Sequence, residues 1–472
     1  MSLLDELRDA VGASQVLVGD DCAAYEVDWR KRYHGRALAV VRPGSTAEVA
    51  AVVAACRGHG ASLVAQGGNT GLVGASVPDA SGQQVLLSTV RLNRVRKVDP
   101  ANLTMVVEAG CVLQRVQEEA AAHGLMFALS LAAEGSCTIG GNLATNAGGT
   151  QVLRYGNARE LCLGIEAVTA EGRVWDGLSG LRKDNTGYDL RDLIIGSEGT
   201  LAIITAATLR LHPRPRATMT AMATVPSLAA AVELLGRAHA LLGPGLTGFE
   251  IMNDESLGLV RKHFAELRHA VGPASWTVLV EHSDAEGEAH AQAALEALLG
   301  DALERTLIAD AAVASSLEQA NAMWHVRETI PLAQVAEGAN IKHDIALPIS
   351  AIEEFVATTD ADLVRAFPGV RVIDFGHLGD GNLHYNVQGP PDADIDAFLA
   401  RHEGAITRMV YHAVAARGGS ISAEHGIGAL KRDELALRKS PVALDMMRAV
   451  KAALDPAGVL NPGRVLPPPL PR

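Results

Sequence analysis

The sequence predicts an α+β protein with more than one domain, and three observations lead to this prediction. The chain has 472 residues, which exceeds what one hydrophobic core usually organises. Short strand-like runs alternate with helical segments along its whole length. The run HPRPR interrupts this pattern and indicates a domain boundary. We therefore expect a first domain over residues 1–212 and a second α+β domain after it.

The composition is that of an ordinary globular protein, with 48% hydrophobic and 20% charged residues. A formal net charge of −13 argues against a nucleic-acid partner, whose phosphates require a basic surface. The opening residues MSLLDELRDAVGASQ are unlike a signal peptide. No apolar run reaches the roughly 18 residues of a membrane span. We therefore expect a cytoplasmic protein without a membrane span.

The five cysteines are scattered, odd in number and contain no CxxC pair. This pattern argues against disulfides, zinc fingers and dithiol chemistry. We interpret them as small buried apolar residues.

The first domain contains a predicted helix followed by a glycine-rich loop. Ser45 and Glu48 are spaced as a capping box at the start of that helix. The strand-like run ASLVAQ comes next and leads into QGGNTGLVGASVP; a second glycine-rich stretch, GSCTIGGNLATNAGG, follows later. Neither stretch matches GxGxxG or GxxxxGK[ST], so neither a Rossmann site nor a P-loop is supported.

Glycine removes the Cβ atom, so backbone amides can turn toward one centre and approach a pyrophosphate closely. One such loop alone is more often a tight turn. Two in the same domain favour a phosphate-binding role.

With these loops the chain resembles the FAD-binding flavoproteins of the vanillyl-alcohol oxidase type, in particular their FAD-linked D-2-hydroxy-acid dehydrogenase branch. The matching pieces are VVRPGSTAEV, QGGNTGLVGASVP, GSCTIGGNLATNAGG, DLRDLIIGSEGTLAIIT and DPAGVLNPGR. The resemblance implies a two-part FAD-binding domain of vanillyl-alcohol oxidase/PCMH type. It also implies an inserted α+β cap domain built on an antiparallel sheet. The cap would cover residues 213–424, and residues 425–472 would return to the FAD-binding domain.

The resemblance implies that FAD is bound by residues from both glycine-rich stretches and from the two ends of the domain. These residues are Pro43, Gln66, Gly67, Gly68, Asn69, Thr70, Gly71, Gly74, Ala75, Ser76, Ser136, Gly140, Asn142, Thr145, Ile203 and Asn461. Family members with covalent flavin often carry a histidine in the first loop, where this chain has Asn69. We therefore expect non-covalent FAD.

The run VIDFGHLGDGNLHYNV predicts a hairpin, because Asp380–Gly381 is a strong two-residue turn signal. A turn at these two residues makes His377 and His384 direct cross-strand neighbours, with Cβ atoms about 5 Å apart. Both imidazoles could then reach one ion, and Asn386 would share their face. The alternative is that both are surface histidines of a hairpin.

A second histidine motif weakens that alternative. In SISAEHGIG, Glu424 and His425 lie in a glycine-flanked loop after a long helix. The family resemblance assigns His377, His384 and Glu424 as metal ligands. Two imidazoles and a carboxylate suit Zn²⁺ with open positions for substrate, although Mn²⁺ or Co²⁺ would also fit.

Two basic residues are candidates for binding substrate carboxylates. Arg327 lies in a predicted helix, and Lys342 lies with Asp344 on one face of the predicted strand NIKHDIALP. Most such residues are solvated surface charges, but the apolar run around Lys342 argues for a specific role. The resemblance places both at the substrate. In the 2-hydroxyglutarate enzymes of this branch a threonine often stands where this chain has Pro331.

These assignments predict FAD-dependent, metal-assisted oxidation of a small D-2-hydroxy acid. D-2-hydroxyglutarate, giving 2-oxoglutarate, is the expected substrate, with D-lactate or glycolate as alternatives. Arg327, Lys342 and Asn386 would hold the carboxylates, His425 would act as general base, and hydride would pass from C2 to flavin N5.

The sequence leaves the electron acceptor open between an electron-transfer flavoprotein, a quinone and a soluble carrier, and the family resemblance implies a homodimer. A metal-dependent hydrolase would leave the glycine-rich loops unexplained. A non-catalytic flavin-binding protein would leave the histidine and glutamate set unexplained.

Overall fold

The computed structural model describes residues 1–338, 340–391 and 393–467. The chain divides into two compact units. Unit 1 comprises residues 1–149, 155–214 and 424–472, and unit 2 comprises residues 150–154 and 215–423. The chain thus leaves unit 1 and returns to it, and the excursion at residues 150–154 was not anticipated. The roles expected for the two domains stay predictions.

Unit 1 contains a four-stranded sheet with the strand order β1-β2-β4-β3. The strands are β1 (Val16–Leu17), β2 (Ala37–Val41), β3 (Leu63–Gln66) and β4 (Gln84–Ser88). β4 pairs in parallel with β2 and β3, whereas β1 pairs antiparallel with β2. Helices α1 (Leu3–Val11) and α2 (Thr46–Gly58) share one hydrophobic core with this sheet.

Helix α2 begins where the sequence predicted it. The Ser45 hydroxyl accepts a hydrogen bond from the backbone N–H of Glu48 (3.2 Å). The Glu48 carboxylate accepts from the N–H of Gly44 (2.7 Å), one residue before the position that a capping box uses.

A second sheet of unit 1 is antiparallel throughout, with the order β5-β6-β10-β8-β9. Its strands are β5 (Val95–Asp99), β6 (Thr104–Glu108), β8 (Cys162–Thr169), β9 (Val174–Gly177) and β10 (Ala202–Arg210). A short pair, β7 (Leu125–Met126) and β11 (His212–Pro213), lies apart from it. The helices around these strands and in the returning segment are α3 (Leu113–Ala122), α4 (Ile139–Ala144), α6 (Leu190–Ile194), α13 (Arg432–Arg438) and α14 (Pro441–Leu454). The short helix α5 (Val152–Tyr155) begins within the excursion and ends at the first residue of unit 1 after it.

Unit 2 is built on an antiparallel sheet that has eight strands among the described residues. The order is β15-β12-β14-β13-β18-β19-β16, and β17 also pairs with β19. The strands are β12 (Ala217–Val225), β13 (Leu246–Asn253), β14 (Trp276–Asp284), β15 (Asp310–Val313), β16 (Asn340–Ile341), β17 (Asp344–Ala346), β18 (Arg371–His377) and β19 (Asn382–Gln388). The predicted antiparallel sheet is therefore present.

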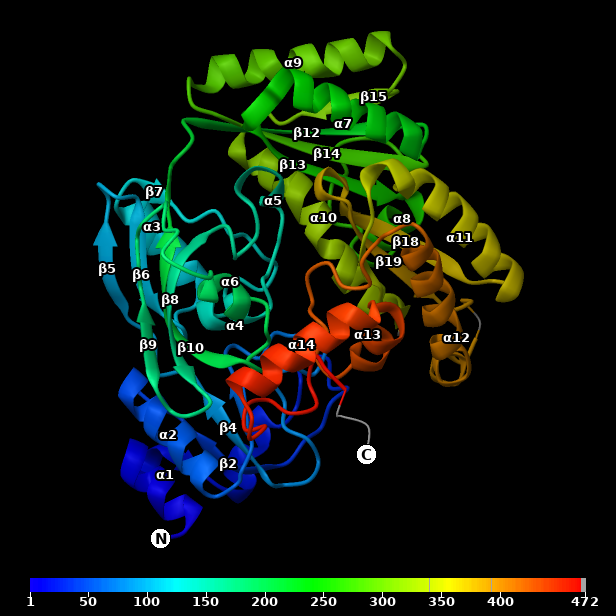
Figure 1. Cartoon of the computed structure of the whole chain (residues 1–472). Coiled ribbons are helices and arrows are strands. Elements are labelled where there is room, and N and C mark those ends of the chain that lie inside the picture. Colours follow the sequence, from blue (N-terminus) through cyan, green and yellow to red (C-terminus); the bar gives the residue numbers. More distant parts are fainter. Residues whose placement is uncertain (339, 392, 468–472) are drawn as a thin grey trace. The chain divides into compact units, whose positions relative to one another are not determined.

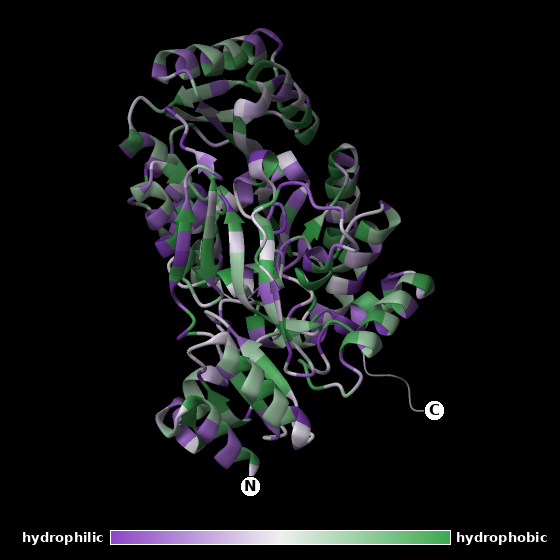
Figure 2. Cartoon of the chain, turned by 60° about the vertical axis from the view of Figure 1, so that its left-hand side comes forward, coloured by the Kyte–Doolittle hydropathy of each residue, from purple (hydrophilic) through white to green (hydrophobic). Residues whose placement is uncertain are grey.

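Helices cover both faces of the sheet of unit 2. They are α7 (Leu228–Leu242), α8 (Asp254–His263), α9 (Glu288–Glu304), α10 (Leu317–Glu337), α11 (Ile352–Ala366) and α12 (Ile395–Ala416). Side chains alternate between two cores: Ala221 and Ala223 pack with α7 and α9, whereas Met222 packs with α8 and α10. Figure 1 shows α7 and α9 side by side on their face. Figure 2 shows hydrophilic and hydrophobic residues mixed around the helices, as expected for helices with one buried side.

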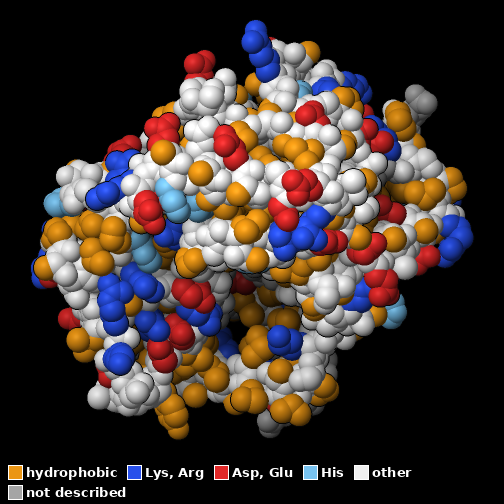
Figure 3. Space-filling view, turned by 90° about the horizontal axis from the view of Figure 1, so that it is seen from above, with side chains coloured by type: hydrophobic (Ala, Val, Ile, Leu, Met, Phe, Trp, Pro, Cys, Tyr) orange, Lys and Arg blue, Asp and Glu red, His pale blue; other side chains and the backbone are white. Residues whose placement is uncertain are grey.

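Charged side chains of both signs are interspersed on the face drawn in Figure 3. Ion pairs also join helices of unit 2, such as that between Arg237 of α7 and Asp301 of α9 (2.7 Å). Among the described residues, no helix is both long enough and apolar enough to cross a membrane.

All five cysteines are buried and none forms a disulfide. Burial raises the pKa of Cys56 and Cys162 to about 12 and that of Cys111 and Cys137 to about 11. The thiolate is the reactive form.

The native protein should therefore not react with Ellman's reagent at pH 8, and the five thiols should react after unfolding in guanidinium chloride. A thiol that reacts stoichiometrically within seconds in the native protein would contradict this packing.

Candidate functional site

The first glycine-rich loop, residues 66–76, follows directly after β3. The Gln66 side-chain amide donates to the carbonyl oxygens of Tyr25 and Ser76 (2.9 Å each), which joins the two ends of the loop. Asn69 has a φ of 54°. Its side-chain N–H₂ group donates to the carbonyl of Val27 (2.9 Å), and its side-chain oxygen accepts from the Ser76 hydroxyl (3.1 Å). These bonds hold the loop in a fixed shape before any ligand binds.

The second glycine-rich loop packs directly on the first. A Cβ atom at Gly68 would lie 2.0 Å from the carbonyl oxygen of Ser136. One at Gly67 would lie 2.3 Å from the Thr138 hydroxyl oxygen. Glycine is therefore required at both positions for the two loops to meet.

A third segment, Ser197 to Gly199, joins α6 to β10 beside these loops. Glu198 has a φ of 54°, and its carboxylate accepts from the N–H groups of Ile427 (2.7 Å) and Gly428 (2.8 Å). Burial raises the pKa of Glu198 above its usual value, although the two N–H donors act in the opposite direction. Glu198 therefore ties this segment to the returning chain.

The three segments line one cavity in unit 1. Its lining includes most of the expected FAD contacts, namely Gln66, Gly67, Gly68, Asn69, Thr70, Gly71, Ala75, Ser76, Gly140, Asn142, Thr145 and Ile203. Three buried polar atoms of lining residues have no hydrogen-bond partner among the described residues: Thr138 Oγ1, Asn142 Nδ2 and Ser197 Oγ. Buried polar groups are normally paired. The cavity therefore fits a ligand rich in hydrogen-bonding groups, as FAD is.

Four expected FAD contacts, Pro43, Gly74, Ser136 and Asn461, are outside this lining, and the assignment of all the expected contacts to FAD stays a prediction. Sequence reasoning also missed Thr138, Ser197 and Glu198, which do line the cavity. The available signal for Ser197 and Glu198 was the run GSEG, whose glycines Gly196 and Gly199 both have positive φ.

Asn461 connects the returning segment to the loops of the cavity. Its side-chain N–H₂ group donates to the carbonyl oxygens of Ala75 (3.0 Å) and Glu198 (2.8 Å). The backbone N–H of Asn461 donates to the carbonyl of Leu63 in β3 (2.8 Å). Its amide oxygen is buried and has no partner among the described residues.

In unit 2 the predicted hairpin forms, but its register and turn differ from the prediction. His377 pairs with Asn382, and His384 pairs with Phe375. The expected direct pairing of His377 with His384 is therefore wrong. Leu378–Asp380 form a 3₁₀ turn that ends at Gly381, which has a φ of 81°.

The reason for the longer turn is the burial of Leu378, whose side chain is part of the hydrophobic core of unit 2. This removes Leu378 from the strand. The two imidazoles still share one face of the sheet as diagonal neighbours, with ring centroids 5.6 Å apart.

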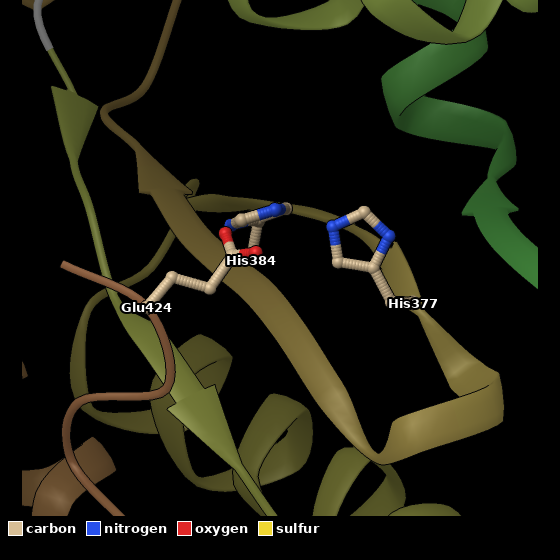
Figure 4. A group of neighbouring side chains, drawn as sticks. All are labelled: His377, His384 and Glu424. Atoms are coloured by element: carbon tan, nitrogen blue, oxygen red, sulfur yellow. The ribbon is translucent and has the colours of Figure 1, made fainter. Parts of the chain in front are cut away.

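The three expected metal ligands lie together. One ligand atom from each of His377, His384 and Glu424 lies within 4.8 Å of the other two. Glu424 directly follows Ala423, the last residue of unit 2. Figure 4 shows one ring nitrogen of His377 directed toward His384 and Glu424 and the other directed away. Two imidazoles and a carboxylate at this spacing suit a divalent cation.

A second group at the same place includes a residue that the sequence analysis had not assigned. Ligand atoms of Asp344, Glu424 and His425 also lie within 4.8 Å of one another. Asp344 is buried and pairs with His384 in register. His425, the expected base, therefore lies beside the same potential cation ligands.

Arg327 occupies the middle of α10 and is almost fully buried, so it is not a solvated surface charge. Its Nε atom donates to Oε2 of Glu250 (2.8 Å), and Nη2 lies 2.7 Å from the same oxygen. The guanidinium also lies over the ring of Phe375, 4.8 Å from the centroid.

Glu250, which sequence reasoning missed, is 1% exposed. Burial raises its pKa, but His377 and Arg327 lower it by more, so the pKa lies below its usual value.

The expected continuous strand through Lys342 is wrong. β16 ends at Ile341 and β17 begins at Asp344, so the half-buried Lys342 lies between two short strands. The interruption arises because the Asn386 side-chain oxygen accepts from the backbone N–H of His343 (3.1 Å) in place of a ladder carbonyl. The Asn386 side-chain N–H₂ group donates to Gln334 (3.1 Å), so protein groups engage both ends of this amide.

Comparisons with known proteins agree with these features. A model described as "FAD binding domain" matches residues 37–177, and one described as "FAD linked oxidases, C-terminal domain" matches residues 214–465. The D-2-hydroxyglutarate dehydrogenase of Bos taurus mitochondria is 40% identical over 93% of this chain and 79% of its own length. The D-2-hydroxyglutarate dehydrogenase of Xanthomonas citri pv. viticola is 38% identical over 94% of this chain and 92% of its own length.

Among solved structures, p-cresol methylhydroxylase with substrate bound is similar with a TM-score of 0.77 and 16% identity. The match covers 98% of this chain and 96% of that one. At this identity the likeness concerns the fold, and it confirms the predicted α+β fold of vanillyl-alcohol oxidase/PCMH type.

Replacing Asn461 by Asp should destabilise unit 1 and weaken its hold on FAD. The substitution keeps the shape but turns an acceptor toward the carbonyls of Ala75 and Glu198. A buried mismatch of this kind costs about 1–3 kcal/mol or more. We expect a thermal midpoint lower by several degrees and a lower flavin content after gel filtration. Asn93→Asp is the control, because Asn93 is exposed and also donates to one carbonyl, that of Val90. Equal behaviour of the two variants would contradict the role of Asn461.

Proposed function

Because the chain belongs to the family of FAD-linked oxidases and is an FAD-dependent hydroxy-acid dehydrogenase, we propose that it oxidises D-2-hydroxyglutarate to 2-oxoglutarate with the help of a divalent cation. The observation that carries this proposal is the grouping of ligand atoms from His377, His384 and Glu424 within 4.8 Å. Relatives with 40% and 38% identity are named as D-2-hydroxyglutarate dehydrogenases, which supports the choice of substrate.

The substrate is a five-carbon dicarboxylate, so its site needs cationic groups for two carboxylates. Arg327 and Lys342 are the proposed anchors. Arg327 is suited to this role because a guanidinium binds carboxylates in a fixed geometry. Nη1 of Arg327 has no hydrogen-bond partner among the described residues, which leaves a donor for a ligand. Asn386 is a weaker candidate for direct contact, since His343 and Gln334 engage its amide.

His377, His384 and Glu424 are the proposed cation ligands. Zn²⁺ suits two imidazoles and one carboxylate, and Mn²⁺ or Co²⁺ suits them as well. A bound divalent cation supplies Lewis-acid chemistry, lowering the pKa of a coordinated hydroxyl group. His425 is the proposed base that accepts the proton of the substrate's 2-hydroxyl, because an imidazole titrates near neutral pH.

FAD, when bound, accepts the hydride that leaves C2 of the substrate. We propose that it is held without a covalent bond. The polar atoms of Thr138, Asn142 and Ser197 in the lined cavity would supply hydrogen bonds to it. Asn69, which stands where covalent family members often carry histidine, is engaged with Val27 and Ser76.

An electron-transfer flavoprotein or a quinone is the proposed acceptor of the electrons, and a homodimer is the proposed assembly. A cytoplasmic location stays a prediction, and the Bos taurus relative is named as mitochondrial.

Anaerobic titration of the flavin spectrum tests the proposed reaction. Adding D-2-hydroxyglutarate to the purified protein should bleach the visible flavin bands, because the substrate reduces FAD. D-lactate and glycolate are tested in parallel, and L-2-hydroxyglutarate is the stereochemical control. Bleaching by D-lactate or glycolate but not by D-2-hydroxyglutarate would replace the proposed substrate. No bleaching by any of them would overturn the proposed oxidation.

Two histidine substitutions should have separable effects. His384→Ala should abolish stoichiometric Zn²⁺, measured by mass spectrometry of the metal, and most activity. His425→Ala should keep Zn²⁺ but slow flavin reduction in stopped flow by about 10²–10⁴-fold, the usual contribution of a general base. His239→Ala, at an exposed residue of α7, is the control. Loss of Zn²⁺ from the His425 variant would instead favour the group of Asp344, Glu424 and His425 as the cation site.

A further inference from the structure

The buried carboxylate of Glu250 contacts two residues to which the proposed function gives different tasks. Glu250 lies on β13 and pairs in register with His377 on β18. Arg327 reaches it from α10, which covers the same face of the sheet. All three residues belong to unit 2. The inference drawn from this contact rests on the proposed function.

Both oxygens of Glu250 are engaged. Oε1 lies 2.6 Å from Nδ1 of His377, and Oε2 accepts from Nε of Arg327 at 2.8 Å. The exposed fraction of Glu250 is 1%, so water does not screen these contacts. A buried carboxylate requires such partners, because an unpaired buried charge is strongly destabilising.

The contact between Glu250 and His377 selects one tautomer of the neutral His377 imidazole. A carboxylate at Nδ1 accepts a hydrogen bond from an N–H at that nitrogen, so the proton of the neutral ring stays on Nδ1 and the lone pair lies on Nε2. Figure 4 shows a ring nitrogen of His377 directed toward His384 and Glu424. Glu250 therefore orients the ring and makes Nε2 a ligand for a cation.

The contact with Arg327 has a corresponding effect. It uses one edge of the guanidinium, Nε and Nη2, while the ring of Phe375 lies against its plane. The side chain is thereby held in one orientation. Nη1, the remaining donor, keeps a fixed direction, as a residue that binds a substrate carboxylate requires.

We propose that Glu250 is a positioning residue: its one carboxylate holds the cation ligand His377 and the substrate anchor Arg327 in fixed orientations relative to each other. Without the second oxygen as acceptor, either the imidazole or the guanidinium loses its orientation. Binding of the cation and binding of the substrate therefore both depend on Glu250, although it touches neither.

An ordinary buried ion pair that only stabilises unit 2 is the alternative, and the chain offers a matched control. Glu281 lies on the neighbouring strand β14 and is partly buried. Its carboxylate accepts from Thr247 (2.8 Å) and from Trp324 of α10 (3.0 Å). It contacts the same helix as Glu250, but its hydrogen-bond partners Thr247 and Trp324 are not proposed site residues.

The experiment compares Glu250→Gln with Glu281→Gln in the full-length holoprotein. The affinity for Zn²⁺ is measured by competition with a chelating dye after removal of bound metal, and KM and kcat are measured with D-2-hydroxyglutarate. We expect Glu250→Gln to lower Zn²⁺ affinity by about 10–100-fold, the usual effect of removing a group that orients a metal-binding histidine. KM should rise at saturating Zn²⁺, because Arg327 is no longer fixed. Glu281→Gln should leave both quantities unchanged.

The outcomes separate this inference from the proposed function. Wild-type protein that binds Zn²⁺ together with a folded Glu250→Gln variant that binds it equally well and keeps its KM would overturn the inference alone. Wild-type protein that binds none of Zn²⁺, Mn²⁺ and Co²⁺ would overturn both. If Glu250→Gln does not fold, Glu250→Asp is measured instead. It keeps the charge opposite Arg327, and its shorter side chain cannot reach both partners, so the same losses are expected.

Discussion

The docking of the C-terminal segment onto β3 is the contact on which the structure of unit 1 depends. Leu460 is fully buried in the core of the four-stranded sheet, and it forms a parallel bridge with Leu63. The Asp455 carboxylate accepts from the N–H groups of Val459 and Leu460, and Lys451 bonds to Asp455 and to the carbonyl of Thr200. Loop-closure entropy grows slowly with loop length, so an insertion as long as unit 2 adds little to the cost of this closure. The buried contacts at Leu460 therefore suffice to complete unit 1.

The two units contain different kinds of polar group. The cavity of unit 1 is lined mainly by glycines, amides and hydroxyls, whose neutral dipoles suit the spread charge and the many polar atoms of a dinucleotide. Unit 2 instead buries full charges: Glu250 and Arg327 oppose each other beside His377. A compact dicarboxylate requires cations, and a buried cation requires a compensating anion. Glu250 provides that compensation.

The sequence predicted the architecture better than the local geometry. The start of helix α2 at Ser45 depends on residues adjacent in the chain, whose effects are local and recognisable. The register of the hairpin was wrong because it depends on Leu378, which leaves the strand to fill a core that distant helices build. Glu250 could not be predicted at all. An isolated glutamate within an apolar strand carries no motif, and its role arises only when β18 and α10 pack around it.

The contact between the two glycine-rich loops also determines how the cavity can respond to mutation. At Gly68 the obstacle to a side chain is the backbone carbonyl of Ser136, which cannot move aside as a flexible side chain could. Any larger residue there would separate the two loops and deform the walls on both sides of the cavity at once. Most other lining positions contribute a side chain to the cavity wall. Substitutions at residues such as Thr138 or Ser197 can therefore change the affinity of the cavity for its ligand. The shape of the cavity depends instead on the main-chain contact between the two loops, so it can change only as a whole.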